Sequence, residues 1–199
     1  METVRVLLLD IKEIAGRKDV FVRLLSDEDI KRSDRFINDS DKLLSIGSAF
    51  LKNKYVDGTI SVNSYGKPES NKCCFNISHS HDLVGLAITH NHKVGLDIER
   101  RQNLSDDVKA YCLSEHEIKE LDKDDALKYF VSKECLVKAE GSGLPDDIKS
   151  VPALPLDGEV EYKNKKYYRH TINSNSHYIS VALEGADFEI HTEELTGNE

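Results

Sequence analysis

The 199-residue sequence predicts an α+β fold built from two halves that share one core. Both halves contain stretches with the apolar spacing of helices and stretches with the alternation of strands. The second half ends in short strand-like segments joined by brief links, which favours antiparallel hairpins. Neither a sequence repeat nor a low-complexity linker divides the chain. We therefore expect antiparallel sheets with helices in each half and no separate domains.

The first half is predicted to contain two helices and four strands. One helix begins after Ser26, because a capping hydroxyl there precedes three acidic residues at the positive end of the helix dipole. A second helix covers 40–54, where apolar residues recur at helical spacing. Gly66-Lys67-Pro68 forms a turn. The expected strands are 4–9, 72–78, 83–89 and 94–99.

The second half is predicted to begin with helices and end with strands. Residues 105–123 are charged and helical, and the next helix runs over about 125–140, closed by Gly141 and Gly143. A loop with three prolines follows. The expected strands are 158–163, 165–171, 177–183 and 186–191, before an acidic tail that is expected to fray.

Composition excludes several classes of protein. The net charge of −9 argues against nucleic acid as a partner, since that requires a basic surface. The N-terminal apolar run is too short for a signal peptide or a membrane span. Four cysteines without CxxC spacing are expected to be free thiols in a reducing cytoplasm. A local basic cluster at 31–35 suits a small phosphorylated ligand better than a polymer.

Two acidic residues stand out in the predicted strand 94–99. Asp97 and Glu99 are two positions apart, so their side chains share one face, roughly 6.5–7 Å apart along the backbone. Like charges on one face repel each other unless a positive group lies between them. A hard divalent cation such as Mg²⁺ would satisfy both carboxylates. The alternative is a solvated outer face of the strand.

The helix over 127–138 carries two charges on its apolar side. Glu134 and Lys138 fall in the middle of an arc otherwise formed by apolar residues, so both are expected to be buried or to line a cleft. They could pair with each other at their i, i+4 spacing. The other interpretation is a third metal-binding carboxylate beside a lysine for a phosphate.

Four blocks of residues occur in a distinctive order along the chain. They are Gly66-Lys67-Pro68, Phe75-Asn76-Ile77-Ser78-His79-Ser80, Asp97-x-Glu99 and Phe130-x-x-Lys133-Glu134-Cys135-x-x-Lys138-x-x-Gly141. Leu113-Ser114-x-x-Glu117 lies between the last two. Together, over about residues 66–143, these blocks resemble the 4′-phosphopantetheinyl transferases, specifically the surfactin-type monomeric branch.

The resemblance implies a fold and a reaction. It implies a pseudo-dimer of two similar α/β half-domains, here 1–95 with the nucleotide contacts and 96–199 with the metal ligands and catalytic helix. Coenzyme A would bind in the cleft between them. The implied reaction is the Mg²⁺-dependent transfer of phosphopantetheine from coenzyme A to a serine of an acyl or peptidyl carrier protein, as in holo-acyl-carrier-protein synthases. The product is 3′,5′-ADP, and the enzyme is a cytoplasmic monomer without membrane contacts.

The resemblance also implies roles for individual residues. Asp97, Glu99 and Glu134 would hold Mg²⁺ against the pyrophosphate of coenzyme A. Lys138 and Lys133 would contact the same phosphates, and Glu117 would take the proton from the attacking serine.

Further residues are implied to bind the nucleotide. His79 matches a contact to the 3′-phosphate, and Ser78, Lys67 and Arg32 are expected to contact coenzyme A as well. In the first helix region, this chain departs from the family. Three positions where a basic or polar residue is common are occupied by Asp29, Leu43 and Leu44.

Other functions are weaker interpretations of the same residues. The main alternative is a non-catalytic module that binds coenzyme A or a carrier protein. A generic Mg²⁺-dependent phosphoryl transferase lacks a Walker-type glycine-rich loop. Zinc binding by the histidine pairs 79/81 and 90/92 lacks a completed tetrahedral ligand set. A triad of Ser78, His79 and Asp82 is disfavoured because adjacent strand residues face opposite ways.

Overall fold

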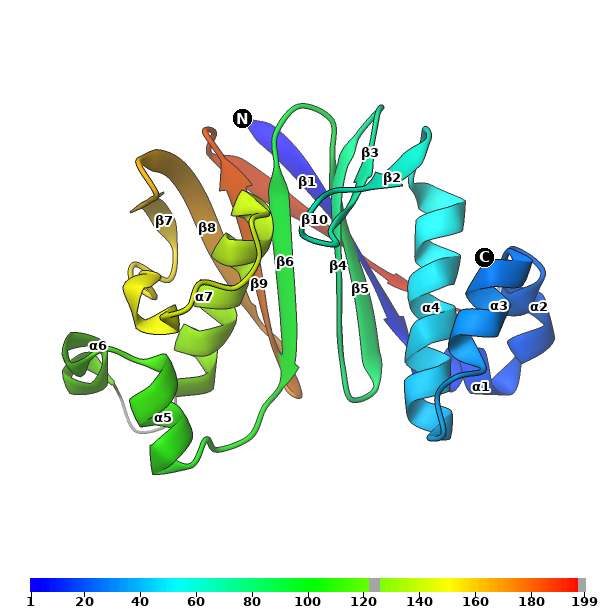
Figure 1. Ribbon diagram of the computed structural model, residues 1–199, viewed down its shortest axis with the longest axis horizontal. Coiled ribbons are helices and arrows are strands. Elements are labelled where there is room, and N and C mark those ends of the chain that lie inside the picture. Colours follow the sequence, from blue (N-terminus) through cyan, green and yellow to red (C-terminus); the bar gives the residue numbers. More distant parts are fainter. Residues whose placement is uncertain (122–125, 197–199) are drawn as a thin grey trace.

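The computed structural model describes residues 1–121 and 126–196. Within these ranges the chain forms an α+β fold of two four-stranded sheets, a small two-stranded sheet and seven α-helices (Figure 1). All sheet pairings except one are antiparallel. The predicted fold class is therefore confirmed.

The first sheet has the strand order β10-β1-β5-β4. Its strands are β1 (Glu2–Asp10), β4 (Cys74–Ser80), β5 (Leu83–Thr89) and β10 (Phe188–Leu195). Four helices cover it, of which α4 packs directly on the strands (Figure 1). They are α1 (Ile11–Gly16), α2 (Lys18–Val22), α3 (Asp27–Ser33) and α4 (Asp39–Tyr55). A hairpin of β2 (Ile60–Val62) and β3 (Pro68–Ser70) follows α4.

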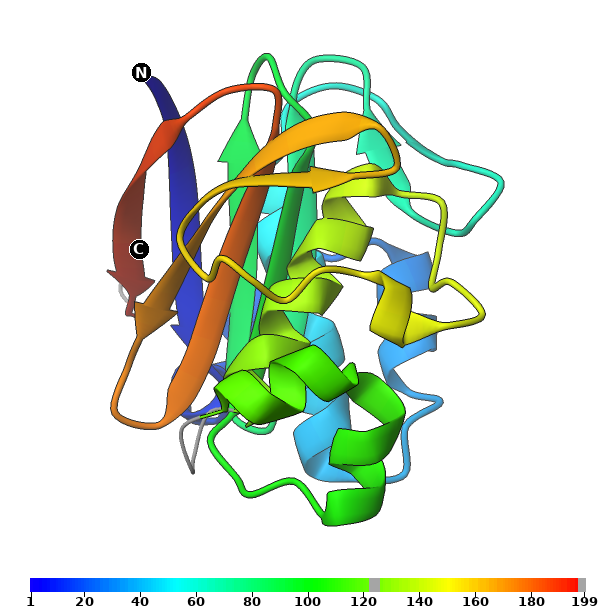
Figure 2. The same cartoon turned by 90° about the vertical axis from the view of Figure 1, so that its left-hand side faces the viewer.

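The second sheet has the order β6-β9-β8-β7. Its strands are β6 (Val94–Arg100), β7 (Gly158–Tyr162), β8 (Lys165–Asn173) and β9 (His177–Glu184). The helices of this half are α5 (Asp106–Cys112), α6 (Glu115–Glu120) and α7 (Ala126–Glu140), and a 3₁₀ turn covers Ile148–Ser150. Figure 2 shows α7 running along this sheet, with α5 and α6 near one end of it.

The structure differs from the sequence prediction in several elements, since α1, α2, β2 and β3 were not predicted. The helix expected at 105–123 is two short helices, because Ser114 starts a new capping box with Glu117; its last two residues lie outside the described ranges. The acidic tail does not fray at its start, since β10 continues to Leu195 and pairs in parallel with β1. The last strand thus returns to the first sheet, which a division at residue 95 does not anticipate.

Gly95 sets the distance between α7 and β6. A Cβ atom built at this position would lie 1.9 Å from the carbonyl oxygen of Cys135 and 2.4 Å from the amide nitrogen of Ala139. Both atoms belong to the helix backbone, which cannot move aside as a side chain can. The absence of a side chain at Gly95 therefore lets α7 lie directly on β6, close to the acidic residues of that strand.

Candidate functional site

Strands β4 and β6 meet at the junction of the two halves, where side chains replace a backbone ladder. Three N–H groups of β6 each donate to a side-chain oxygen of β4, at every second residue. The pairs are Leu96 to Asn76 Oδ1 at 2.9 Å, Ile98 to Ser78 Oγ at 3.2 Å and Arg100 to Ser80 Oγ at 3.2 Å. We call this row of contacts the seam. It satisfies the exposed edge of β6 and aligns the two sheets.

The two seam serines also hold the two acidic residues of β6. The Ser78 hydroxyl donates to Asp97 Oδ1 at 3.1 Å, and the Ser80 hydroxyl donates to Glu99 Oε2 at 2.7 Å. A hydroxyl can accept from a backbone N–H and donate to a carboxylate at the same time. The prediction included Ser78 but missed Ser80. The sequence does indicate Ser80, because Ser78 and Ser80 are two positions apart on one strand, as Asp97 and Glu99 are on another.

Asp97 lies at the centre of the site. It is only 3% exposed, and Lys138 Nζ lies 2.6 Å from its Oδ1 and 3.1 Å from Ser78 Oγ. Lys138 of α7 thus pairs with Asp97 of the adjacent strand β6. The other oxygen, Asp97 Oδ2, is buried without a hydrogen-bond partner among the described residues. Burial raises the pKa of Asp97, while Lys138 and Ser78 act in the opposite direction.

Three carboxylates influence one another at the junction. Burial raises the pKa of Glu134, and the charges of Asp97 and Glu99 raise it further. Burial likewise raises the pKa of Glu99, with Asp97 adding to the effect. Glu134 is half-buried on α7, as expected from its position in the apolar arc. The structure therefore brings together negative charges from two elements that would be stabilised by a cation.

The donor chemistry suits a hard cation, although the structure does not show a metal site. Among the described residues, no group of three or more His, Cys, Asp or Glu side chains is arranged to hold a metal ion. The unpartnered Asp97 Oδ2 and the raised pKa values are nevertheless what a site for Mg²⁺ requires, because that ion prefers carboxylate oxygens. Binding would need the three carboxylates to turn toward a common point.

Glu117 and Lys133 form a buried ion pair between α6 and α7. Glu117 is 5% exposed to solvent and Lys133 is 0% exposed. Lys133 Nζ lies 2.8 Å from Glu117 Oε2. Glu117 also accepts the N–H groups of Ser114 and Ala153, each at 2.8 Å. Although burial raises the pKa of Glu117, these hydrogen bonds outweigh it and hold the pKa below its usual range.

Both residues were predicted to act in the reaction, Glu117 as the base and Lys133 as a phosphate contact. A base must reach the proton it removes, and the Glu117 carboxylate is enclosed and committed to three donors. Lys133 Nζ contacts Glu117 and donates to the carbonyl oxygen of Ile148 at 3.3 Å, which leaves one of its three N–H donors. Both residues have a structural role in this arrangement, and their roles as the base and as a phosphate contact stay predictions.

Arg169 supports the same region and was missed by the sequence analysis. It is fully buried and donates to the carbonyl oxygens of Ser132, Pro152, Ala153 and Pro155. These contacts hold the proline-containing loop against α7. The sequence offers no signal for this role, since a lone arginine in a strand is normally solvated.

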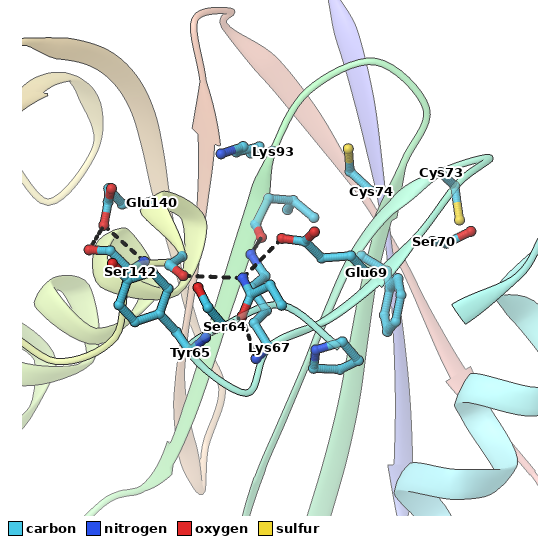
Figure 3. Close-up of a pocket in the computed structure, with 15 residues that line it drawn as sticks. Ser64, Tyr65, Lys67, Glu69, Ser70, Cys73, Cys74, Lys93, Glu140 and Ser142 are labelled. Atoms are coloured by element: carbon cyan, nitrogen blue, oxygen red, sulfur yellow. Dashed lines mark hydrogen bonds between the residues drawn. The ribbon is translucent and has the colours of Figure 1, made fainter. Parts of the chain in front are cut away.

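Lys67 joins the first half to the end of α7. Its Nζ donates to the carbonyl oxygens of Lys138 and Val94, and burial lowers its pKa to about 8. Figure 3 shows it in a cavity of about 510 Å³ between the β2–β3 hairpin and the C-terminal end of α7. The ammonium group predicted to contact the nucleotide is thus engaged by backbone at this interface.

A second cavity, of about 270 Å³, lies in the first half between α3, α4 and β4. His79 and Arg32, both predicted to contact the nucleotide, line it. The charges of Lys138 and Asp97 both act on the pKa of His79, so this cavity lies within electrostatic range of the acidic site. Partial burial and then the charge of Lys138 lower the pKa of His79 below its ordinary value of 6.5. The imidazole is therefore mainly neutral at pH 7.

Asp29 and Lys52 neutralise each other in the wall of this cavity. Lys52 Nζ lies 3.0 Å from Asp29 Oδ1, and Asn53 donates to Asp29 Oδ2 at 2.9 Å. Although burial raises the pKa of Asp29, hydrogen bonds from Asn53, Lys52 and Ser26 outweigh it and lower the pKa to about 2. Asp29 is therefore ionised throughout the physiological pH range.

Asp29→Asn should lower the free energy of unfolding at pH 7, by about 1–2 kcal/mol, because it removes a charge-assisted hydrogen-bond acceptor. The lowered pKa of Asp29 contributes stability above pH 4 that is lost as pH falls toward 2. The deficit of the variant should therefore shrink over that interval. Urea unfolding of both proteins between pH 3 and 7 measures it; a deficit that stays constant with pH would contradict this account.

Comparison with known families found a similarity in the second half of the chain. Residues 93–191, just under half of the chain, match the model of the 4′-phosphopantetheinyl transferase superfamily. The matched segment contains Asp97, Glu99, Glu134 and Lys138, and the match supports phosphopantetheine transfer in general. A search of curated proteins found no match. Among the described helices, none combines the length and apolar character needed to cross a bilayer.

Proposed function

We propose that this protein transfers the 4′-phosphopantetheine group from a coenzyme A donor to a serine of an apo acyl or peptidyl carrier protein, with Mg²⁺ as the metal ion. The nucleotide part of the donor, 3′,5′-ADP for coenzyme A, is the leaving group. The activity is that of a holo-acyl-carrier-protein synthase of the surfactin-type branch. Both walls of the cleft come from one chain, which supports a monomer, and the four free thiols suit a reducing cytoplasm.

The observation that carries this proposal is that the charges of Asp97, Glu99 and Glu134 act on one another, with Lys138 in contact with Asp97, near the junction of the halves. These three carboxylates would hold the metal. A bound Mg²⁺ would neutralise the charge that develops on the pyrophosphate as its phosphorus–oxygen bond breaks. The unpartnered Asp97 Oδ2 supports this assignment, because an isolated buried carboxylate oxygen is costly unless something binds it.

The surrounding residues orient the acids and the donor. Ser78 and Ser80 each fix one oxygen of an acidic side chain, which leaves the other oxygen directed elsewhere. Lys138 supplies a positive charge at the same place, and a lysine can contact a phosphate without strict geometry. The cavity lined by His79 and Arg32 lies within electrostatic range of this point and provides room for the nucleoside part of the donor.

Mass spectrometry of an apo carrier domain tests the proposal directly. The protein is incubated with coenzyme A, Mg²⁺ and several acyl and peptidyl carrier domains, and the mass gain of a phosphopantetheine group is measured. We expect transfer to at least one carrier and its loss when EDTA removes the metal. If no carrier gains mass, while coenzyme A binds by calorimetry, the alternative of a non-catalytic binding module is correct instead.

A further inference from the structure

The cavity between α3, α4 and β4 carries no surplus of positive charge. Its charged lining consists of the carboxylates Asp29 and Asp41 and the cations Arg32 and Lys52, so the formal charges sum to zero. Lys52 is already paired with Asp29 at 3.0 Å. The remaining titratable group, His79, has a lowered pKa and is mainly neutral at pH 7. A second phosphate group entering this cavity would therefore meet the neutralised pair, one further carboxylate, Asp41, and one further cation, Arg32.

The rest of the lining suits an uncharged nucleoside. Apolar walls and small hydroxyl side chains alternate around the cavity, and they come from Phe36, Leu44, Ala49, Pro68, Ile77, Ser45 and Ser48. Carboxylates in nucleotide sites typically accept hydrogen bonds from ribose hydroxyls, whereas arginine-rich sites accommodate a phosphate on the same ring. Asp41 lies at the start of α4, is exposed, and has one oxygen engaged by Asn38 Nδ2 at 3.1 Å. Its carboxylate retains acceptor capacity for a ribose hydroxyl.

The position of the cavity relates it to the proposed chemistry. His79 lies on β4 between Ser78 and Ser80, whose hydroxyl groups hold Asp97 and Glu99. A donor whose pyrophosphate lies at those acids and Lys138 can extend its nucleoside past His79 into this cavity. On the other side of Lys138, the ammonium group of Lys67 is already engaged by the backbone at the end of α7.

We infer that the ribose 3′ position of the donor is read here as a hydroxyl group, so that 3′-dephospho-coenzyme A serves as a donor at least as well as coenzyme A. The inference rests on the proposed function and specifies its substrate class. The serine oxygen of the carrier forms a bond to the phosphorus atom next to pantetheine, and the bond from that phosphorus to the bridging oxygen breaks. The leaving group is 5′-AMP in place of 3′,5′-ADP, and the serine proton is released to water.

Transfer assays with the two donors test the inference. We expect the kcat/KM for dephospho-coenzyme A to equal or exceed that for coenzyme A with one carrier at one Mg²⁺ concentration. Asp41→Lys should shift the ratio toward coenzyme A by about tenfold, since it exchanges a hydroxyl acceptor for a phosphate partner. Asp39→Lys is the matched control, because Asp39 is an exposed acid in the same first turn that does not line the cavity. Its donor ratio should stay at the wild-type value.

The outcomes separate the inference from the proposed function. A preference of the wild-type protein for coenzyme A above tenfold overturns the inference and leaves the function intact. A donor ratio that shifts equally in both lysine variants also overturns it, since a general change of surface charge then explains the effect. Equilibrium binding of each donor by calorimetry gives an independent readout, and we expect the 3′-phosphate to add no affinity. Failure to transfer from either donor would contradict the proposed function itself.

Discussion

Glu134→Gln should reduce kcat/KM for carrier modification by at least about a hundredfold and leave the fold at least as stable as the wild type. Glutamine keeps the shape of the side chain but removes the charge with which Glu134 would hold the metal, and losses of this size are typical when a group that stabilises developing charge is removed. Steady-state assays at saturating Mg²⁺ measure the loss.

The expected gain in stability follows from the raised pKa of Glu134. Burial and the charges of Asp97 and Glu99 raise it, so the ionised carboxylate costs free energy in the folded protein without metal. Because the folded protein binds this proton more tightly than the unfolded chain does, Glu134 contributes to stability below about pH 4.5, its ordinary pKa. This contribution is lost as the pH rises through the raised pKa of the folded protein. At pH 7 a neutral glutamine should therefore raise the melting temperature in EDTA. Sites built for function commonly show this opposition between activity and stability.

Glu140→Gln provides the opposite control on the same helix. Although burial raises the pKa of Glu140, hydrogen bonds from Ser142 and Lys163 outweigh it and lower the pKa. Its Oε2 lies 3.1 Å from Lys163 Nζ. This variant should lose stability and keep its transfer rate. Normal turnover in Glu134→Gln, or a similar loss in both variants, would remove Glu134 from the metal site.

The sequence evidence for the three acids and Lys138 is local. Alternation along one strand places Asp97 and Glu99 on one face, and helical spacing places Glu134 and Lys138 in the apolar arc of α7. The sequence left two possible partners for Lys138, Glu134 or a phosphate group. In the structure its partner is Asp97. The packing of α7 on β6, which Gly95 permits, decides that contact, and it is not written in the helix or the strand alone.

The surroundings of Lys133 could not be predicted from the sequence, for a different physical reason. An amphipathic helix has a polar face to which charged residues can be assigned, but α7 is buried on nearly all sides. The second sheet covers one side, while α6 and the loop held by Arg169 cover another. A motif with a lysine next to a candidate metal ligand suggested a phosphate contact. The lysine instead faces Glu117, whose capping box on α6 gave no sign of the longer-range pair.

Lys133→Met should destabilise the protein by about 3–5 kcal/mol, the usual cost of leaving one member of a buried ion pair without its partner. The methionine fills most of the space of the lysine stem, so the loss comes from the uncompensated carboxylate of Glu117 rather than from a cavity. Urea unfolding followed by circular dichroism measures the free energy of unfolding. A cost below about 1 kcal/mol would show that the pair is solvated in solution.

Adding Glu117→Gln to Lys133→Met separates the structural role of Glu117 from the catalytic role first predicted for it. Glutamine retains an oxygen that can accept the N–H of Ala153 and removes the isolated charge, so the double variant should regain much of the lost stability. If Glu117 only joins α6 to α7 and the following loop, the refolded double variant should turn over carrier protein close to the wild-type rate. If it were the base, the same variant would be stable and inactive, as Glu134→Gln should be. Stability and turnover measured on the same variant thus distinguish a structural role of Glu117 from a catalytic one.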